Sequence, residues 1–253
     1  MYPLPSPCFG AAIREAFTKP WHEGDMLRAI LPAIFALALA GCQLLPGSDG
    51  GGRGPDVPRT PPTIDRSGTA ASSLAGQQCL VRLGENGADF SPLPDRADAP
   101  GCTRFNTVSL TALQGDIGRF SIANLGPVTC ETAGTFAGWV RFGVDRAARV
   151  HLGSALDRIE TFGSYACRNI AGSNRKSAHA RAEAIDIAAF VLVDGRRISI
   201  ASDWNSGTPA EREFLRVVRD SACKRFGTVL SPDYNTAHAD HLHLEIGGGS
   251  FCR

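Results

Sequence analysis

The sequence predicts an α+β domain: a small, mainly antiparallel sheet with packed helices, stabilised by disulfide bonds. One observation is an Asp-Gly pair at 194–195 between two apolar runs, the strongest short-range signal of a β-hairpin. Another is a capping box, Thr-Pro-Ala-Glu at 208–211, ahead of an amphipathic run typical of a helix. The third is an even set of six cysteines after residue 77, typical of an exported domain.

Length and composition limit the possible functions. The chain has 253 residues, 43% of them hydrophobic and 20% charged, and its formal net charge is +1. This length suits one sizeable domain with appendages. We expect no nucleic-acid partner, because the charge is balanced and the arginines are spread along the whole chain. We expect a monomer.

The N-terminal segment is typical of a bacterial lipoprotein signal. Residues 1–25 carry prolines and no periodicity, so we interpret them as a leader outside the real protein, which then starts at Met26. Residues 26–42 form the predicted signal peptide. Their apolar run is shorter than the about 20 residues of a membrane span, and a lipobox ends at Cys42, which is expected to be acylated. Cleavage by the ordinary signal peptidase and a buried core helix are the alternatives.

A tether is predicted after the acylated cysteine. Residues 43–77 are rich in Gly, Pro, Ser and Thr and have few large apolar side chains. Such a segment cannot bury enough surface to offset its ordering entropy, so we predict a flexible connection to the membrane. Gln43, rather than Asp, follows the cysteine, which favours the outer membrane over the inner one. The predicted location is therefore the cell envelope, lipid-anchored and facing the periplasm.

The predicted domain begins near residue 78 and has two parts. Residues 78–128 contain short apolar pieces broken by Pro and Gly, which predict an N-terminal lobe of irregular structure held by cysteines. Residues 129–253 form the predicted catalytic core. In this part, apolar spacing predicts a helix over 130–142 with Thr129 as its cap.

The rest of the core alternates between strand-like and helical patterns. The helix that begins after Thr208 is expected to run to about Phe226, with Gly227 placed to stop it. Trp139 and Trp204 are expected to pack in the interior rather than to form a sugar-binding platform. Strand-like runs lie at 158–166, 184–193, 197–201 and 241–246, of which the last is expected to close the domain.

The cysteines predict disulfide bonds without a unique pairing. Six remain once Cys8 and Cys42 are set aside, so up to three bonds are possible in fifteen combinations. Cys79 with Cys102 is the favoured local pair. No Cys-x-x-Cys occurs, which disfavours zinc ligation by cysteine and thioredoxin-type chemistry. The candidates are Cys79, Cys102, Cys130, Cys167, Cys223 and Cys252.

Four of the six histidines fall in two short stretches, His179 ahead of Asp186 and a His-x-x-His-x-His run that ends at His243. Neutral imidazole and carboxylate are the ligands of hydrolytic zinc sites, which keep a fourth position for water. Side chains alternate along a strand, so His241, His243 and Glu245 are expected to share one face while the intervening apolar residues enter the core. The pattern predicts zinc-dependent hydrolysis.

The pattern Ser-x-His-x6-Asp followed by His-x-His resembles that of zinc peptidases. This group includes D-alanyl-D-alanine carboxypeptidases, murein endopeptidases and the zinc domain of hedgehog proteins, and the resemblance implies their fold. Within the group, the sequence is most similar to the bacterial extensin-like C-terminal family. The matching stretches are 163–168, 179–187 and 238–244, and the similarity covers roughly residues 79 to 253.

The resemblance implies roles for individual residues. The implied activity is metal-assisted hydrolysis of amide bonds in peptidoglycan peptides, as a carboxypeptidase or an endopeptidase. The base would take a proton from the attacking water and return it to the leaving amine. The implied site residues are the Zn²⁺ ligands His179, Asp186 and His243, the base His241, the auxiliary His238 near the water, and Arg168 in contact with a substrate carboxylate or carbonyl.

Two positions leave alternatives open. Ala182 stands where the wider group has Gly, four residues before the ligand Asp; if φ is positive there, alanine costs about 1 kcal/mol. For Arg168, a surface salt bridge is an equal alternative to substrate contact. For the domain as a whole, the alternative is a non-catalytic zinc domain that binds the cell wall or a partner protein. Serine esterase chemistry lacks its Gly-x-Ser-x-Gly signature.

Four charged residues near the histidine motifs have weaker assignments. Asp240 or Glu245 is a candidate to orient an imidazole, as ligand histidines usually require. Arg175 and Lys176 are expected to lie on a solvated loop and are given no role.

Overall fold

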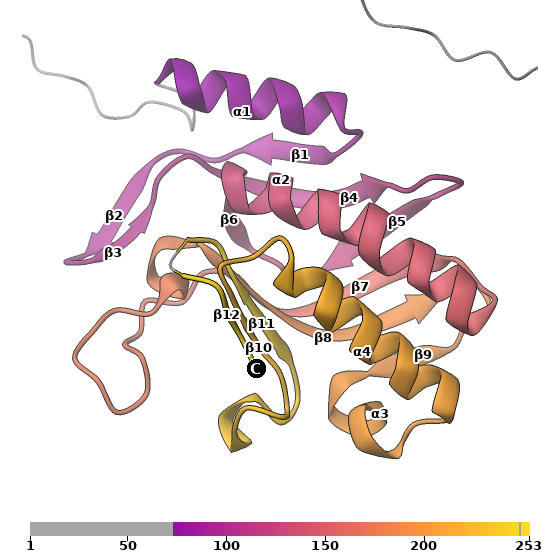
Figure 1. Cartoon of the computed structure of the whole chain (residues 1–253). Helices are drawn as coiled ribbons and strands as arrows, with labels where there is room; N and C mark the ends of the chain where they lie inside the picture. The colour runs from indigo at the N-terminus through magenta and orange to yellow at the C-terminus, as the bar shows by residue number, and fades with distance from the viewer. Residues whose placement is uncertain (1–72, 248) are drawn as a thin grey trace, which may run out of the picture. The chain divides into compact units, whose positions relative to one another are not determined.

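The computed structural model describes residues 73–247 and 249–253, and Figure 1 shows their arrangement. The predicted α+β class is confirmed. The elements of this part of the chain are α1 (Leu74–Glu85), β1 (Asp89–Pro92), β2 (Arg96–Ala99), β3 (Cys102–Arg104), β4 (Thr107–Gln114), β5 (Arg119–Ala123), β6 (Pro127–Thr129), α2 (Cys130–Trp139), the π-helical segments η1 (Val140–Asp145) and η2 (Ala148–Leu152), β7 (Leu156–Gly163), the 3-10 helix η3 (Ala178–Arg181), β8 (Ala184–Leu192), β9 (Arg197–Ser199), α3 (Ile200–Ser206), α4 (Pro209–Cys223), β10 (Thr228–Leu230), the 3-10 helix η4 (Thr236–His238), β11 (Leu242–Glu245) and β12 (Phe251–Cys252).

One large sheet holds ten of the strands, in the order β1-β4-β5-β7-β8-β11-β10-β12, with β6 beside β4 and β9 beside β8. Its pairs are antiparallel except for β5 with β7 and β10 with β12. Strands β2 and β3 form a separate hairpin. The prediction of a mainly antiparallel sheet is confirmed, although this sheet is larger than expected and includes strands from both parts of the domain.

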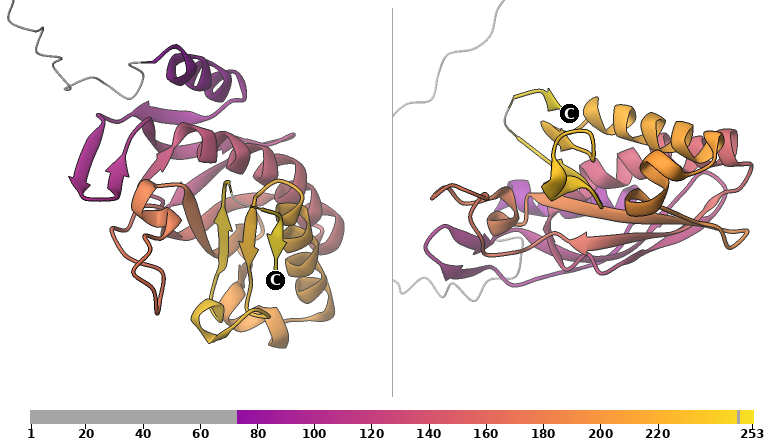
Figure 2. Two further views of the ribbon diagram at one scale, coloured as in Figure 1. Left: turned by 60° about the vertical axis from the view of Figure 1, so that its left-hand side comes forward. Right: turned by 90° about the horizontal axis from the view of Figure 1, so that it is seen from below.

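Helices α2 and α4 lie on the same face of the sheet, as Figures 1 and 2 show. The ring of Phe190 on β8 packs edge-on against Trp139 of α2 and Phe214 of α4, with ring centroids 6.2 and 5.3 Å apart. Trp139 and Trp204 are both buried, which confirms their expected packing role. The hydrophobic core therefore lies between the sheet and these helices.

A β-bulge in β8 decides which of its side chains face the helices. The pairing of β7 with β8 skips Ala188, so one extra residue is inserted into the alternation. Because of this insertion, Ile187 and Phe190 both belong to the core, although they are three residues apart. Asp186 alternates with Ile187 and therefore points to the opposite face, away from α2 and α4.

The local signals at turns and helix starts are confirmed. Strands β8 and β9 form the predicted hairpin, and Gly195 in its turn has a φ of 86°. The Thr208 hydroxyl accepts from the Glu211 backbone N–H while the Glu211 side chain accepts from the Thr208 backbone N–H, which completes the capping box of α4. At α2, the Thr129 hydroxyl accepts from the backbone of the first turn. Short-range sequence rules therefore hold where the partners are within a few residues.

Several boundaries differ from the predictions. Helix α4 ends at Cys223 rather than Phe226, and Gly227 does not stop it: the Gly227 N–H donates to Glu245 O at 2.9 Å within the sheet. The helix from Cys130 continues beyond residue 142 as η1. The strand predicted over 197–201 ends early because α3 begins at Ile200.

The N-terminal part is regular, so the expectation of irregular structure there is wrong. Helix α1 begins at Leu74 with the Ser73 side chain as its cap, before the expected start of order at Gln78. Glycines such as Gly87 and Gly101, which have φ of 76° and 73°, lie at turns and do not interrupt the strands between them. The strand at 241–246 is also not the last one, because β12 follows it and pairs with β10.

The disulfide pairing is Cys79–Cys130, Cys102–Cys167 and Cys223–Cys252. The predicted local pair Cys79–Cys102 is therefore wrong. The reason is that α1 packs along α2, which brings Cys79 to the first residue of α2, while the β2–β3 hairpin carries Cys102 to the segment after β7. All three bonds join elements that are distant in sequence.

Some predictions concern residues outside the described part of the chain. The leader at 1–25, the signal peptide at 26–42 with acylated Cys42, and residues 43–72 of the tether belong to this group. Within residues 73–247 and 249–253, none of the helices has the length and hydropathy that crossing a bilayer requires.

We predict that Gly227→Ala destabilises the fold by about 1–3 kcal/mol, the usual cost of forcing an extra group into a packed site. A Cβ at Gly227 would overlap the carbonyl group of Gly247, so the backbone of this region would have to move. The free energy of unfolding is measured by urea titration with the disulfides intact. The matched control is Gly138→Ala in α2, where a Cβ meets open space and stabilisation of about 0.5–1 kcal/mol is expected. Equal effects of the two variants would contradict this account.

Candidate metal centre

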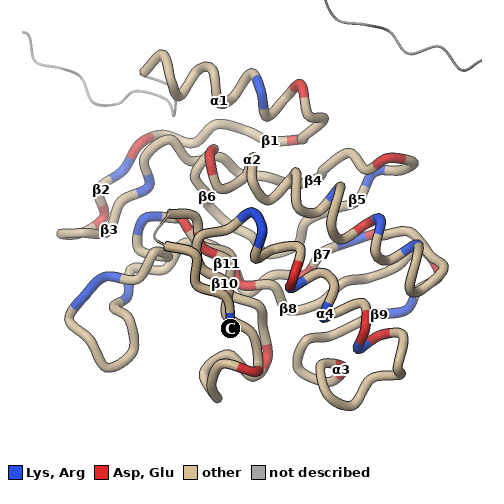
Figure 3. The backbone as a smooth tube through the Cα atoms, viewed as in Figure 1, with Lys and Arg blue, Asp and Glu red and all other residues tan. Residues whose placement is uncertain are grey.

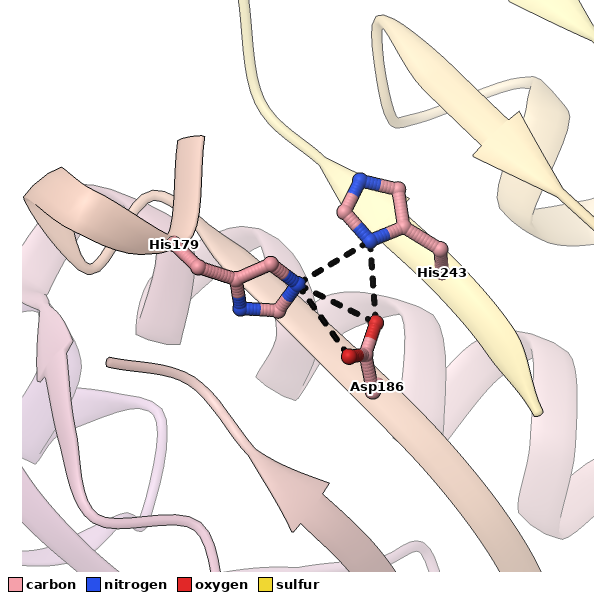
Figure 4. Close-up of side chains that lie close together, drawn as sticks. All are labelled: His179, Asp186 and His243. Atoms are coloured by element: carbon pink, nitrogen blue, oxygen red, sulfur yellow. Dashed lines mark hydrogen bonds and ion pairs between the residues drawn. The ribbon is translucent and has the colours of Figure 1, made fainter. Parts of the chain in front are cut away.

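Three side chains that are distant in sequence converge on the face of the sheet opposite α2 and α4 (Figure 4). His179 Nε2 lies 3.2 Å from both carboxylate oxygens of Asp186 and 3.1 Å from His243 Nδ1. His243 Nδ1 lies 2.9 Å from Asp186 Oδ1. The three residues are only 2%, 8% and 7% exposed, respectively. The structure thus brings together the three predicted ligands, and their donor atoms could hold a metal ion.

His179 is held by the short helix η3. The Ser177 hydroxyl accepts from the His179 N–H at this helix's N-terminus, and Ala182 follows its end in the left-handed conformation, with φ of 56°. The Ala182 carbonyl accepts from Thr129 N–H at 3.0 Å, which ties the loop to the start of α2. Because φ is positive, alanine at this position lowers the stability of the fold by about 1 kcal/mol relative to glycine, the cost that the sequence analysis expects for this conformation.

Asp186 and His243 are positioned by strand pairing. They are direct partners in the β8–β11 register, so their side chains lie side by side on one face. Leu242 and Leu244, which alternate with His243, are fully buried in the hydrophobic core. The predicted alternation along the final histidine motif is confirmed.

Hydrogen bonds on the far side of each imidazole define where its lone pair points. The carbonyl oxygen of Ser164 lies 2.6 Å from His179 Nδ1, and a carbonyl can only accept, so Nδ1 carries the hydrogen. The Glu245 carboxylate lies 3.4 Å from His243 Nε2 and fixes the opposite tautomer there. In the neutral rings, His179 Nε2 and His243 Nδ1 therefore both aim lone pairs at the Asp186 carboxylate. Three acceptors that converge in a buried site require a cation between them.

The pKa values of Asp186 and His243 are shifted by the contacts within this cluster. Burial alone would raise the pKa of Asp186, but its close contacts with His179 and His243 outweigh it and hold this pKa well below its usual range. Burial would lower the pKa of His243, but the Asp186 and Glu245 carboxylates raise it to about 9. The His243 ring beside Asp186 therefore favours its protonated form.

The donor set fits a zinc ion. Tetrahedral zinc with bonds of about 2.0–2.1 Å places its ligand atoms about 3.3 Å apart. The distances among His179 Nε2, Asp186 Oδ1 and His243 Nδ1 are 2.9 to 3.2 Å, so only a slight expansion is needed. Two imidazoles and one carboxylate also match the ligand types of hydrolytic zinc sites, with a position left open.

The other three predicted site residues lie next to this cluster. His241 Nε2 is 3.5 Å from Asp186 Oδ1, and its Nδ1 is 2.8 Å from the Asp240 carboxylate, which therefore receives the ring hydrogen. Arg168 Nη2 is 3.9 Å from Asp186 Oδ2. The His238 ring packs against His241, with centroids 5.1 Å apart. Of the two candidates to orient an imidazole, Asp240 contacts His241 and Glu245 contacts His243.

His238 differs from His243 in its protonation. Burial and the neighbouring His241 and His243 together lower the pKa of His238 to about 4. Its Nδ1 lies 2.7 Å from Asn235 Oδ1, an acceptor, so the lone pair of the neutral ring is on Nε2. His238 is therefore a neutral hydrogen-bond acceptor near neutral pH.

Next to the cluster lies a cavity of about 680 Å³, which His243 lines. His238, His241 and His243 line it together with β10 and the segment 168–181. Tyr234 and Phe251 form an aromatic part of the wall, with ring centroids 5.8 Å apart. A substrate that enters this cavity would meet the histidines directly.

Sequence reasoning missed several contributors. Phe162, extruded by a second irregularity in the β7–β8 pairing, is 61% exposed, and its ring stands edge-on to His241 at 6.0 Å. The Ser164 carbonyl and the Asn235 side chain orient histidines, but nothing in their local sequence indicates this. Arg175 and Lys176 were expected on a solvated loop, and they line the cavity wall.

Comparison with known proteins identifies one family. The family profile described as extensin-like protein C-terminus matches residues 77–253, which include all described strands and the three converging ligands. No curated protein and no solved structure matches the chain. The matched span is well over half of the sequence. The chain therefore belongs to the extensin-like C-terminal family.

Proposed function

We propose that this protein is a zinc-dependent peptidase that hydrolyses amide bonds in peptidoglycan peptides, as a carboxypeptidase or an endopeptidase. The observation that carries the proposal is the convergence of three lone-pair donors next to an open cavity that His243 lines, with His241 Nε2 at 3.5 Å from Asp186 Oδ1. A purely structural zinc site uses four protein ligands, whereas a catalytic site keeps one position open.

Residues His179, Asp186 and His243 would hold the ion. Bound zinc would supply a Lewis acid that polarises the scissile carbonyl and makes water acidic enough to attack near neutral pH. His241 faces the cluster with Nε2, because its Nδ1 hydrogen is directed to Asp240. It is therefore placed to accept a proton from water at Nε2 and to return it to the leaving amine.

Two further residues would position the substrate and the water. Arg168 lines the cavity beside Asp186 and is half-exposed, so its guanidinium can donate to a substrate carboxylate or carbonyl. His238 is neutral and presents Nε2 as an acceptor, which suits the orientation of a water molecule rather than proton release. Phe162 and His238 pack on the His241 ring and limit its rotation.

The proposed location is the bacterial cell envelope, where peptidoglycan lies. Three disulfide bonds in the described residues support an oxidising compartment such as the periplasm. The lipobox that ends at Cys42 supports anchoring by lipid.

The proposal is tested on the purified full chain, loaded with one equivalent of zinc and incubated with muropeptides. Mass spectrometry of the products is expected to show loss of a terminal amino acid or cleavage of a cross-link, and chelator-treated protein is expected to be inactive. Tight binding of one zinc ion without cleavage of any muropeptide would instead support a non-catalytic zinc domain.

Metal binding at pH 6 is expected to release about one proton, because a metal ion displaces protons from its ligands. The pKa of His243 is raised to about 9 in the metal-free site, so this ring is protonated at pH 6. The pKa of Asp186 is lowered, so its carboxylate has no proton to release. Metal affinity should accordingly fall about tenfold per pH unit below pH 9. Calorimetry in two buffers of different ionisation enthalpy measures the release, and identical heats in both would contradict the prediction.

A further inference from the structure

The cavity has a cationic wall that the proposed mechanism uses only in part. This wall is the segment 168–177, named the arm below, which follows β7 and protrudes beside β2 and β3. Figure 3 shows Lys and Arg positions along this protruding loop in blue. Arg168, Arg175 and Lys176 of the arm line the cavity.

The arm is an ordered hairpin. Backbone contacts join Ser177 to Arg168, Asn169 to Lys176, and Ile170 to Arg175. In such a hairpin, facing residues share a side and successive residues alternate, so Arg168 and Arg175 lie on one face. They are separated by one strand repeat, which is roughly 6.6 Å along the arm. Lys176 belongs to the other face.

That other face rests on the β2–β3 hairpin. The aliphatic stem of Lys176 lies against Gly101, where an added Cβ would come within 3.0 Å of it. The Cys102–Cys167 disulfide joins β3 to the base of the arm, and the Tyr165 hydroxyl donates to Asp98 of β2 at 2.6 Å. These contacts hold the backbone of the arm, from which Arg168 and Arg175 extend, in place before any ligand binds, which reduces the entropy cost of binding.

The arm's charges lack the partners that other surface arginines have. Arg104 pairs with Asp98 at 2.6 Å, and Arg197 pairs with Glu160 at 2.8 Å. Among the described residues, by contrast, Arg175 makes no ion pair with a carboxylate, and Arg168 reaches only Asp186 at 3.9 Å. The cavity wall therefore has an excess of positive charge on the side of the arm.

We propose that Arg175 forms a carboxylate-binding subsite of the cavity, so that the preferred substrates are peptides that carry an acidic side chain one or two residues from the scissile bond. This inference rests on the proposed function for the bond that is cleaved, but the subsite itself requires no metal. Arg168 would contact the carboxylate or carbonyl beside the cluster. Arg175, one repeat further along the same face, would contact the second acidic group.

The test compares matched peptides that differ in one charge. The probes are Xaa-Ala-D-Ala-D-Ala and Ala-Xaa-D-Ala-D-Ala, with Xaa either glutamate or glutamine and an uncharged fluorophore at the N-terminus. Anisotropy measures their binding to the metal-free full chain with its disulfides intact. At one of the two positions, the glutamate peptide is expected to bind about fivefold more tightly than its glutamine partner, as an exposed ion pair allows. The difference in affinity between the two peptides is expected to shrink when NaCl is raised from 0.05 to 0.5 M, because the Debye length shortens by about 10 Å and the ion pair is screened.

Substitutions of Arg175 test whether the arm causes the preference for glutamate. Arg175→Gln is expected to abolish the preference for glutamate, and Arg175→Lys to retain most of it. The matched control is Arg82→Gln, which removes one positive charge from exposed α1, away from the cavity, and should leave the preference unchanged. Equal affinity for both peptides at both positions, or an equal loss in Arg82→Gln, would overturn the inference.

The same peptides separate this inference from the proposed function. A glutamate preference in binding, together with no hydrolysis by the zinc-loaded protein, would support the subsite and contradict the peptidase. Hydrolysis of all four peptides with equal kcat/KM and equal affinity would support the peptidase and contradict the subsite.

Discussion

Asp186→Ala is expected to lose the bound metal ion. Loss of a partner that merely orients a ligand already weakens metal binding about 10–100-fold, so removal of a ligand should cost at least about 100-fold. Asp186 is also the acceptor that both His179 and His243 face, and without its charge the two rings have no anion to hold a cation between them. Elemental analysis after dialysis should find about one equivalent of zinc in the wild-type chain and far less in the variant.

A neighbouring carboxylate supplies the control for this experiment. Asp240→Ala removes an exposed carboxylate that contacts His241 and none of the three converging ligands, so its metal content should stay at the wild-type level. Circular dichroism and a number of titratable thiols equal to that of the wild-type chain would show that both variants keep the fold and the three disulfides. Retention of zinc by Asp186→Ala would refute the proposed ligand set.

His241→Ala is expected to retain zinc but to hydrolyse peptides about 10²–10⁴-fold more slowly, the usual contribution of a positioned general base. The separation of the two effects follows from geometry, because His241 Nε2 stands 3.5 Å from the cluster and the ligand positions are supplied by other residues. The measurements are kcat/KM on the peptide that wild-type protein cleaves best and zinc content on the same sample.

Another histidine controls for the substitution itself. His151 lies on η2, outside the cavity, and His151→Ala should leave both hydrolysis and zinc content unchanged. Asp240→Asn is expected to reduce kcat about 10–100-fold, because the carboxylate orients the His241 ring from outside the cavity lining. Loss of zinc from His241→Ala would make this residue a ligand, and activity within tenfold of wild type would require a different base.

Part of the site is predictable from local pattern, whereas the set of three ligands is implied only by the resemblance to zinc peptidases, because these residues lie far apart in sequence. The two-residue spacing of His241, just before β11, and His243, within it, fixes which face they share. The isoleucines beside Asp186 indicate that the carboxylate leaves the core. Cap residues such as Thr129 and Thr208 act within one helical turn, so their patterns are readable without tertiary information. These features account for the agreement at the start of α2 and α4 and for the shared face of Asp186 and His243.

Relations between distant elements could not be predicted in the same way. Cys79 and Cys130 are separated by 51 residues and Cys102 and Cys167 by 65, and both bonds depend on how whole elements pack. The bulge at Ala188 is a property of the β7–β8 pairing, and an uninterrupted strand would have placed Phe190 on the same face as Asp186. The carbonyl of Ser164 acts through its backbone, which no side-chain pattern reveals.

The C-terminal edge of the sheet has a practical consequence for protein production. Phe251 lines the cavity, and the Arg253 N–H donates to Val229 O at 3.0 Å, which holds the final residues beside β10. A purification tag fused after Arg253 would emerge at this opening. If the tag were polyhistidine, its imidazoles would compete for the same ion and distort any titration, so zinc stoichiometry should be measured on protein with nothing appended there.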